Sequence, residues 1–169
     1  MTLELLNQYF TQYGGIAIFV IVLLEYMNLP GFPAGIIMPL AGIWAANGHI
    51  HFIIAILITV AAGLAGSLIL YLLGYAGGEL FLSKYIKKFP KHKPAIDKNM
   101  EMIKRKGSMG IFISKLIPMV RTLISIPAGV LKMNLPQYII SSTLGICVWN
   151  FFFVGAGYFL GDAVFKYFA

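Results

Sequence analysis

The chain has 169 residues, of which 59% are hydrophobic and only 11% are charged, and its mean hydropathy is +0.84. Because a soluble domain carries about 25% charged residues, this composition excludes an ordinary soluble protein and predicts an integral, all-helical membrane protein. Residues 79–106 hold nine of the 13 Lys and Arg, so the net charge of +7 does not indicate a nucleic-acid-binding surface.

The first apolar segment, Gly15–Leu24, is short and ends at Glu25. Ten helical residues cover about 15 Å, which is half of a hydrocarbon core of roughly 30 Å. This segment therefore spans a membrane only if the preceding turns join it in one helix.

The next segment is apolar but is broken by prolines and glycines. A single helix is interrupted at Pro30, Pro33, Gly35, Pro39 and Gly42. The segment is too apolar for a loop in water, and irregular backbone at membrane depth must be enclosed by protein or a water-filled cavity. We predict a re-entrant hairpin over about residues 25–48.

Phe52–Leu73 has 22 uncharged residues without proline and predicts a spanning helix. Thr59, Gly63 and Ser67 recur every four residues, which favours close packing of another helix. The basic segment 79–106 follows, and the positive-inside rule places it in the cytoplasm. Within it, Ile96, Met100 and Ile103 mark one helical face.

A second broken segment and a second span complete the chain. Pro118 and Pro127 interrupt a predicted re-entrant hairpin over about residues 111–132, and Gln137–Leu160 predicts a spanning helix. We expect Trp149, Tyr138 and Tyr158 near the membrane interfaces.

The two broken segments match in spacing. Pro30 and Pro39 are nine residues apart, as are Pro118 and Pro127, and the offset between the pairs is 88 residues. This indicates an internal repeat whose halves are inverted, an arrangement that places a transport site near the membrane midplane. We expect one membrane domain, 1–169, built from a first repeat, 1–78, the basic segment, 79–106, and a second repeat, 107–169.

Two cations lie in the second broken segment. Lys115 and Arg121 are six residues apart and would occupy different faces of a straight helix, about 240° apart. A chain break at Pro118 lets both face one cavity, where helix N-termini would add N–H groups and a positive dipole end. The segment therefore predicts an anion site within the membrane.

Glu25 is the only acidic residue in either broken segment. A salt bridge from Arg121 to Glu25 would offset the cost of burying arginine, and the planar guanidinium also suits a phosphate. Lys115 is open to two interpretations, because it either lines the site or extends its long side chain to the cytoplasmic surface.

No other pattern in the sequence predicts catalysis or metal binding. We find no nucleophile–base pair of recognisable spacing, no P-loop and no dinucleotide fingerprint, so we expect no enzyme. His49 and His51 are spaced i,i+2 without a neighbouring Cys or carboxylate, so we expect no metal site and no cofactor. Asn150 is expected to make an interhelical hydrogen bond. The sequence leaves open whether transport is coupled to protons or sodium ions.

Three stretches resemble the DedA family of bacterial membrane proteins, whose architecture is shared by the VTT-domain lipid scramblases. They are FISKLIPMVRTLISIPAG, GICVWNFFFVGAGYFLG and LEYMNLPGFPAGIIMPLAG, within residues 15–161. Arg121 matches the family's second-hairpin arginine and Glu25 its first-hairpin acid. Lys115 stands where an arginine is common, and Gly35 where many members carry a second acid.

The resemblance implies a multi-pass protein of the bacterial cytoplasmic membrane that translocates lipid. The preferred cargo is undecaprenyl phosphate, with Arg121, Lys115, Pro118 and Gly129 binding it and Glu25 gating the site. A phospholipid flippase of the phosphatidylethanolamine type is the alternative. A proton- or sodium-coupled small-ion transporter and a membrane enzyme acting on lipid phosphates are alternatives of other classes.

Overall fold

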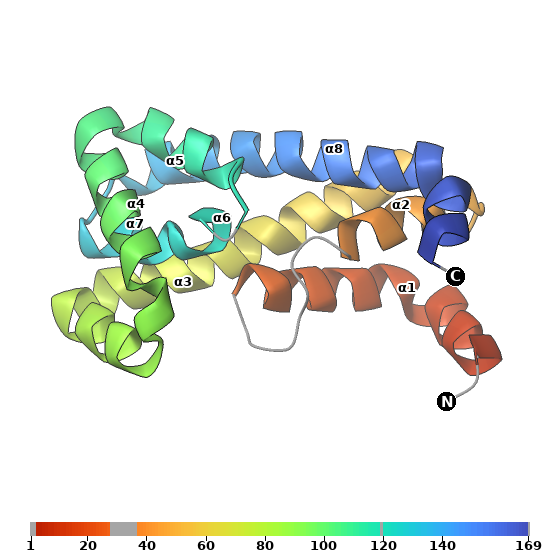
Figure 1. Ribbon diagram of the computed structural model, residues 1–169, viewed down its shortest axis with the longest axis horizontal. Helices are drawn as coiled ribbons and strands as arrows, with labels where there is room; N and C mark the ends of the chain where they lie inside the picture. The colour runs from red at the N-terminus through yellow and green to blue at the C-terminus, as the bar shows by residue number, and fades with distance from the viewer. Residues whose placement is uncertain (1–2, 28–36, 119, 169) are drawn as a thin grey trace.

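The computed structural model describes the backbone of residues 3–27, 37–118 and 120–168, and side chains within 14–161 of these ranges. All elements in these ranges are helical (Figure 1). They are α1 (Leu3–Tyr26), α2 (Ile37–Ala46), α3 (Phe52–Lys88), the 3-10 turn η1 (Pro90–His92), α4 (Lys93–Lys106), α5 (Ser108–Lys115), α6 (Val120–Leu123), α7 (Ser125–Val130) and α8 (Leu135–Phe168).

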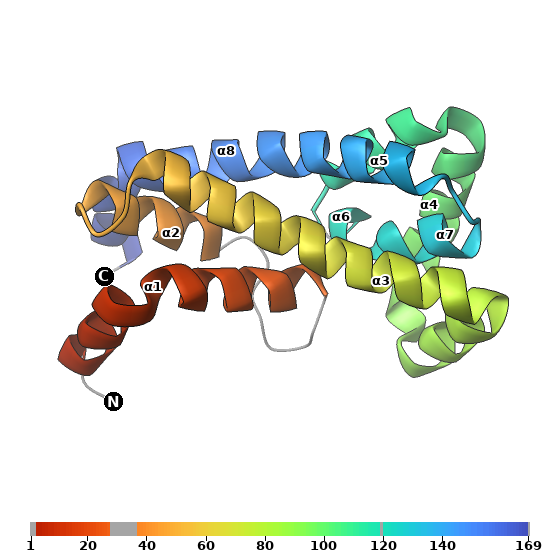
Figure 2. The same ribbon diagram turned by 180° about the vertical axis from the view of Figure 1, so that it is seen from behind.

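Helices α3 and α8 run the length of the molecule in opposite directions (Figures 1 and 2). Each is long and apolar enough to cross a membrane, over Phe52–Lys88 and Leu135–Gly161, as the sequence predicts. Large apolar side chains on both are exposed, among them Leu57 (61%) and Phe152 (69%). Because soluble proteins rarely expose wide apolar surfaces, these faces suit contact with lipid tails.

The shorter helices form two arms that enter from opposite ends (Figure 1). Helix α1 runs from one end to the middle and α2 returns to that end, whereas α5 enters from the other end and α6 and α7 return to it. Within the described residues, the C-terminal end of α1 and the short helix α6 therefore lie together near the middle, and we call these two ends the tips of the arms. Pro30, Pro33 and Gly35, predicted to shape the first tip, lie outside the described residues.

Each arm packs on the long helix of the other half of the chain. A Cβ atom at Gly157 of α8 would lie 2.0 Å from the Pro39 carbonyl oxygen of α2. A Cβ atom at Gly129 of α7 would lie 2.0 Å from the Tyr71 carbonyl oxygen of α3. Real contacts of this length do not occur, so glycine is required for these helices to approach so closely.

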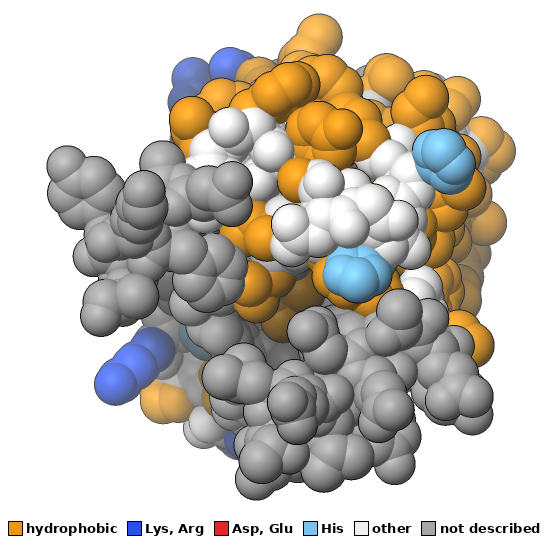
Figure 3. All heavy atoms as spheres, turned by 90° about the vertical axis from the view of Figure 1, so that its right-hand side faces the viewer, with side chains coloured by type: hydrophobic (Ala, Val, Ile, Leu, Met, Phe, Trp, Pro, Cys, Tyr) orange, Lys and Arg blue, Asp and Glu red, His pale blue; other side chains and the backbone are white. Residues whose placement is uncertain are grey.

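The basic segment is helical. Gly78 has a φ of 54° and breaks α3, and α4 ends at Gly107, which also has a φ of 54°. As predicted, Ile96 and Ile103 lie on the buried face of α4. At the opposite end of the molecule, which faces the viewer in Figure 3, the described residues show mostly hydrophobic and uncharged atoms around histidine side chains.

The helix contacts predict opposite effects for two glycines of α8. Gly157→Ala should lower the free energy of unfolding by about 1–3 kcal/mol, because the new methyl group meets the backbone of α2. Gly155 has nothing within 4 Å of its Cβ position, so Gly155→Ala should be neutral or stabilising by about 0.5–1 kcal/mol. Denaturant unfolding in detergent measures both; equal effects would contradict this packing.

Candidate functional site

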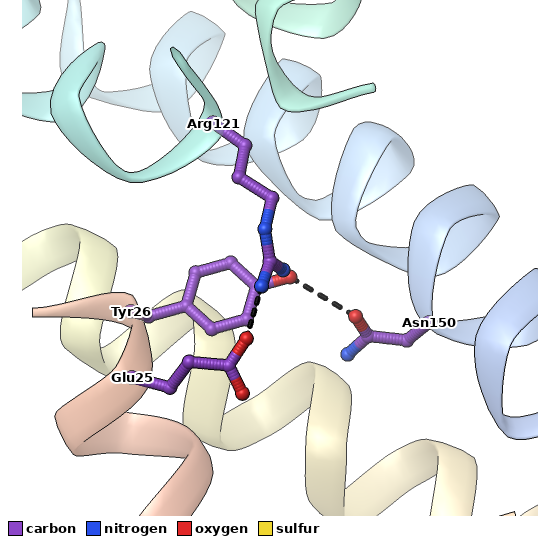
Figure 4. Close-up of polar contacts among 4 residues, drawn as sticks. All are labelled: Glu25, Tyr26, Arg121 and Asn150. Carbon is purple, nitrogen blue, oxygen red and sulfur yellow. Dashed lines mark hydrogen bonds and ion pairs between the residues drawn. The ribbon is translucent and has the colours of Figure 1, made fainter. Parts of the chain in front are cut away.

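A buried ion pair joins the two tips. Arg121 Nη2 of α6 donates to Glu25 Oε1 of α1, and each side chain is only 1% exposed (Figure 4). The predicted Arg121–Glu25 salt bridge is therefore confirmed. Burying two charges is costly, so the pair is a strong constraint: neither residue can be displaced without leaving the other charge uncompensated in the interior.

Two aromatic rings and an amide surround the guanidinium. Arg121 Cζ lies 4.5 Å from the centroid of the Tyr26 ring and 5.0 Å from that of Trp149. Tyr26 Oη donates to Asn150 Oδ1 at 3.0 Å (Figure 4). The predicted interhelical hydrogen bond of Asn150 is confirmed. Trp149, expected at the membrane interface, packs instead against Arg121, since a cation over an aromatic face is attracted to its electrons.

Lys115 is held inside the protein rather than extended to its surface. It is 1% exposed, and its Nζ donates to Ser67 Oγ at 2.8 Å and to Ser125 Oγ at 3.2 Å. Nζ also lies 5.9 Å from the Tyr26 ring centroid. The interpretation in which Lys115 reaches the cytoplasmic surface is therefore wrong. The break between α5 and α6 turns both cations toward Tyr26.

Tyr138 is part of the same support rather than an interfacial residue. Its side chain is fully buried, and Oη lies within hydrogen-bonding distance of Ser125 Oγ, at 2.8 Å, and of the Ser67 carbonyl oxygen, at 3.1 Å. Tyr138 thus fixes the two serines that hold Lys115. A hydroxyl can both donate and accept, so this network accommodates the lysine without a carboxylate.

Three described backbone amides near the break, where the sequence predicts free N–H groups, are already paired. The amide of Val120 donates to the Pro118 carbonyl at 2.7 Å, that of Arg121 to Ile117 at 2.9 Å, and that of Ile124 to Val120 at 3.0 Å. A four-residue helix such as α6 also has a small dipole. These three amides are therefore not available to a ligand, whereas the side chains of Lys115 and Arg121 supply donors at the break.

Two residues predicted to bind substrate, Gly129 and Pro118, occupy positions that a structural role explains. Gly129 faces the backbone of Tyr71 on α3, so we assign it to helix packing rather than to binding. Pro118 is exposed in the turn between α5 and α6, where its effect is to end the helix. Gly42 likewise packs against α8, where a Cβ would lie 2.0 Å from the Val154 carbonyl. Pro127 is buried within α7.

Sequence reasoning missed Tyr26, Ser67 and Ser125 as parts of the site. Tyr26 directly follows Glu25, and an aromatic residue beside an acid within an apolar segment is a signal that could have been used. The two serines carry no such signal, because serine spaced among small residues is also typical of plain helix packing.

Comparison with known proteins identifies the family. A VTT domain matches residues 32–159. The chain belongs to the VTT-domain, or DedA, family. This DedA-family chain is 31% identical to undecaprenyl phosphate transporter A of Staphylococcus aureus over 164 residues, covering 95% of the chain and 80% of the relative.

Two further relatives show the same membership. Undecaprenyl phosphate transporter A of Bacillus subtilis is 33% identical to this DedA-family chain over 150 residues, which are 89% of the chain and 72% of the relative. Protein DedA of Escherichia coli is 28% identical over 138 residues, which are 79% of the chain and 60% of the relative. No solved structure matches the chain.

The ion pair predicts strong energetic coupling between Glu25 and Arg121. Glu25→Gln and Arg121→Met should each destabilise the protein by about 3–5 kcal/mol, because each leaves a charge or a polar group buried without its partner. The double variant should cost less than the sum by about 1–3 kcal/mol. Unfolding in mixed micelles measures the cycle. Additive effects would show that the two side chains do not interact.

Proposed function

We propose that this protein moves an anionic lipid phosphate across the bacterial cytoplasmic membrane, with undecaprenyl phosphate as the preferred cargo and Arg121 holding its phosphate. The observation that carries the proposal is a pair of buried basic side chains, Lys115 and Arg121, that both lie near the Tyr26 ring. Arg121 also pairs with one acid, Glu25. Ionisable residues inside a membrane are rare and mark pathways for charged substrates. The site thus favours an anionic ligand.

The relatives support the same class of cargo. Two of them are named as undecaprenyl phosphate transporters, which also favours transport rather than catalysis. A planar guanidinium offers paired donors to phosphate oxygens, whereas Lys115 offers a compact point charge. The chain therefore has the residue types that a phosphate head requires.

The proposed membrane arrangement is an inverted repeat with two re-entrant hairpins, α1–α2 and α5–α7. Equivalent contacts support it. Between α2 and α8, Gly42 contacts Val154 and Gly157 contacts Pro39. Between α7 and α3, Gly129 contacts Tyr71 and Gly74 contacts Ile126. Gly42 and Gly129 are 87 residues apart, close to the offset of 88 between the proline pairs. Paired broken helices of this kind occur at the substrate sites of transporters.

In this arrangement α3 and α8 cross the membrane and the basic end, which contains α4, faces the cytoplasm. The exposed apolar faces of α3 and α8 stay against lipid, and the polyprenyl tail moves beside them while the head passes through the protein. The cargo thus keeps its tail in a hydrocarbon environment throughout.

The ion pair is the contact that has to open. Arg121 is only 1% exposed, so a phosphate reaches it after the two tips separate. Protonation of Glu25 removes its negative charge and weakens its hold on Arg121, and the phosphate then replaces the carboxylate as partner of the guanidinium. Glu25 thereby couples entry of the phosphate to a proton.

Removing the guanidinium should abolish transport. In reconstituted vesicles, Arg121→Ala should reduce translocation of undecaprenyl phosphate to the level of protein-free vesicles, because the phosphate loses its charged partner. Arg105, the other arginine of the chain, is exposed and pairs with Glu101, so Arg105→Ala should transport normally.

Folding is controlled with the double variant Glu25→Gln/Arg121→Gln, which removes both charges and should fold but not transport. Normal transport by Arg121→Ala would remove Arg121 from the mechanism. Movement of phosphatidylethanolamine but not undecaprenyl phosphate would assign the other lipid cargo, and ion flux without lipid movement would favour a small-ion transporter.

Glu25 should determine the pH dependence of transport. Because protonated Glu25 releases Arg121, the rate should rise as the pH falls on the side from which the proton enters. In Glu25→Gln, which is neutral at every pH, this dependence should be lost. Initial rates in vesicles over a series of pH values measure the effect, and an unchanged profile in the variant would refute proton coupling through Glu25.

A further inference from the structure

Three buried N–H donors around the ion pair have no hydrogen-bond partner within the part of the chain that the structure describes. They are Arg121 Nη1, Trp149 Nε1 and Asn150 Nδ2. Arg121 is 1% exposed and Asn150 is fully buried. A donor removed from water without a partner is destabilising, and native proteins contain few of them. Three such donors at one place call for a functional explanation.

The side chains that carry the three donors form one cluster. The Trp149 ring lies 5.0 Å from Arg121 Cζ. Asn150 accepts a hydrogen bond from the hydroxyl of Tyr26, whose ring the same guanidinium covers (Figure 4). They come from two elements, since Arg121 belongs to α6 and Trp149 and Asn150 are adjacent on α8. The cluster therefore lies where the second arm meets a spanning helix.

Neighbouring contacts hold these side chains in place. Asn150 Oδ1 accepts the Tyr26 hydroxyl, so its oxygen is occupied and its amide nitrogen is the end left over. Trp149 contacts both the guanidinium and the Phe153 ring, whose centroid lies 4.5 Å from that of the indole. Both side chains are thus positioned before any ligand arrives, which reduces the entropy lost on binding.

The chemistry of the cluster favours an oxyanion. An indole N–H donates only, an amide NH₂ donates only, and a guanidinium has no acceptor. A neutral ligand that carries N–H or O–H donors would find no acceptor for these donors among the three groups. A phosphate group has several oxygens that accept, and it also carries the charge that complements Arg121.

We propose that Trp149 and Asn150 bind the substrate phosphate together with Arg121. This inference rests on the proposed function and extends it, because it assigns two neutral donors to a site otherwise defined by charge. The indole N–H and the amide NH₂ each donate to a phosphate oxygen, while the Arg121 Nη1 that Glu25 does not hold takes another. The same donors fit a lipid phosphate or free inorganic phosphate.

Trp149→Phe is the sharpest variant, because it deletes the N–H and keeps an aromatic ring over the guanidinium. Asn150→Asp keeps an acceptor for Tyr26 and replaces the donor with an acceptor. In nanodiscs, each should weaken binding of farnesyl phosphate by about tenfold or more, since a hydrogen bond to a charged group is lost. Trp44→Phe and Asn134→Asp are matched controls and should stay within about twofold of wild type.

A second measurement does not depend on transport. The chain has two tryptophans, so Trp44→Phe leaves Trp149 as the only source of indole fluorescence. Titration with farnesyl phosphate should change the emission of Trp149, and the change should be absent in a Trp44→Phe/Arg121→Gln variant. Inorganic phosphate, titrated separately, distinguishes recognition of a free anion from recognition of a lipid head.

The outcomes separate this inference from the proposed function. Loss of binding in Trp149→Phe, with binding retained in Trp44→Phe, supports the inference even if vesicles show no translocation. Unchanged binding in both Trp149→Phe and Asn150→Asp, while wild type binds and transports, would overturn the inference and leave the proposed function standing. Wild-type protein that binds neither farnesyl phosphate nor inorganic phosphate would also overturn it.

Discussion

The buried pair of Arg121 and Glu25 is the interaction on which the arrangement of the other elements depends. It joins the tips of two arms that enter from opposite ends of the molecule (Figure 1). Both charges are almost fully excluded from solvent, so they stabilise the fold only while they face each other. The close glycine contacts of α2 with α8 and of α7 with α3 bring the arms near enough for this pairing.

In the proposed function, Arg121 exchanges the Glu25 carboxylate for a phosphate. A carboxylate that neutralises a buried guanidinium occupies the position that a phosphate would take, because both offer anionic oxygens to planar donors. Lys115 adds a second cation that is held by Ser67 and Ser125 rather than by an acid. We therefore propose that the protein's own carboxylate closes this site until another anion replaces it.

The sequence is most informative where physical chemistry allows few solutions. An apolar, uncharged run such as Phe52–Leu73 has to be a helix, and the Arg121–Glu25 pair follows because no other acid lies in the broken segments. The position of Trp149 was predicted wrongly, because a tryptophan fits either a membrane interface or a cation. The close contact of Gly129 with α3 was not predicted, because a glycine fits either a ligand site or a helix contact. Only the three-dimensional packing of α3, α7 and α8 distinguishes these alternatives.

The central claim is that a phosphate binds at the Arg121 guanidinium. The chain has two arginines, so Arg105→Lys protein grown with ¹⁵N-arginine carries a label at Arg121 alone. Solid-state NMR can then measure the ³¹P–¹⁵N dipolar coupling between bound farnesyl phosphate and these guanidinium nitrogens. We expect a resolved coupling between the ³¹P signal of farnesyl phosphate and the Arg121 nitrogens. An excess of inorganic phosphate or undecaprenyl phosphate should remove this coupling by competition. Saturated binding without any coupling to Arg121 would contradict it.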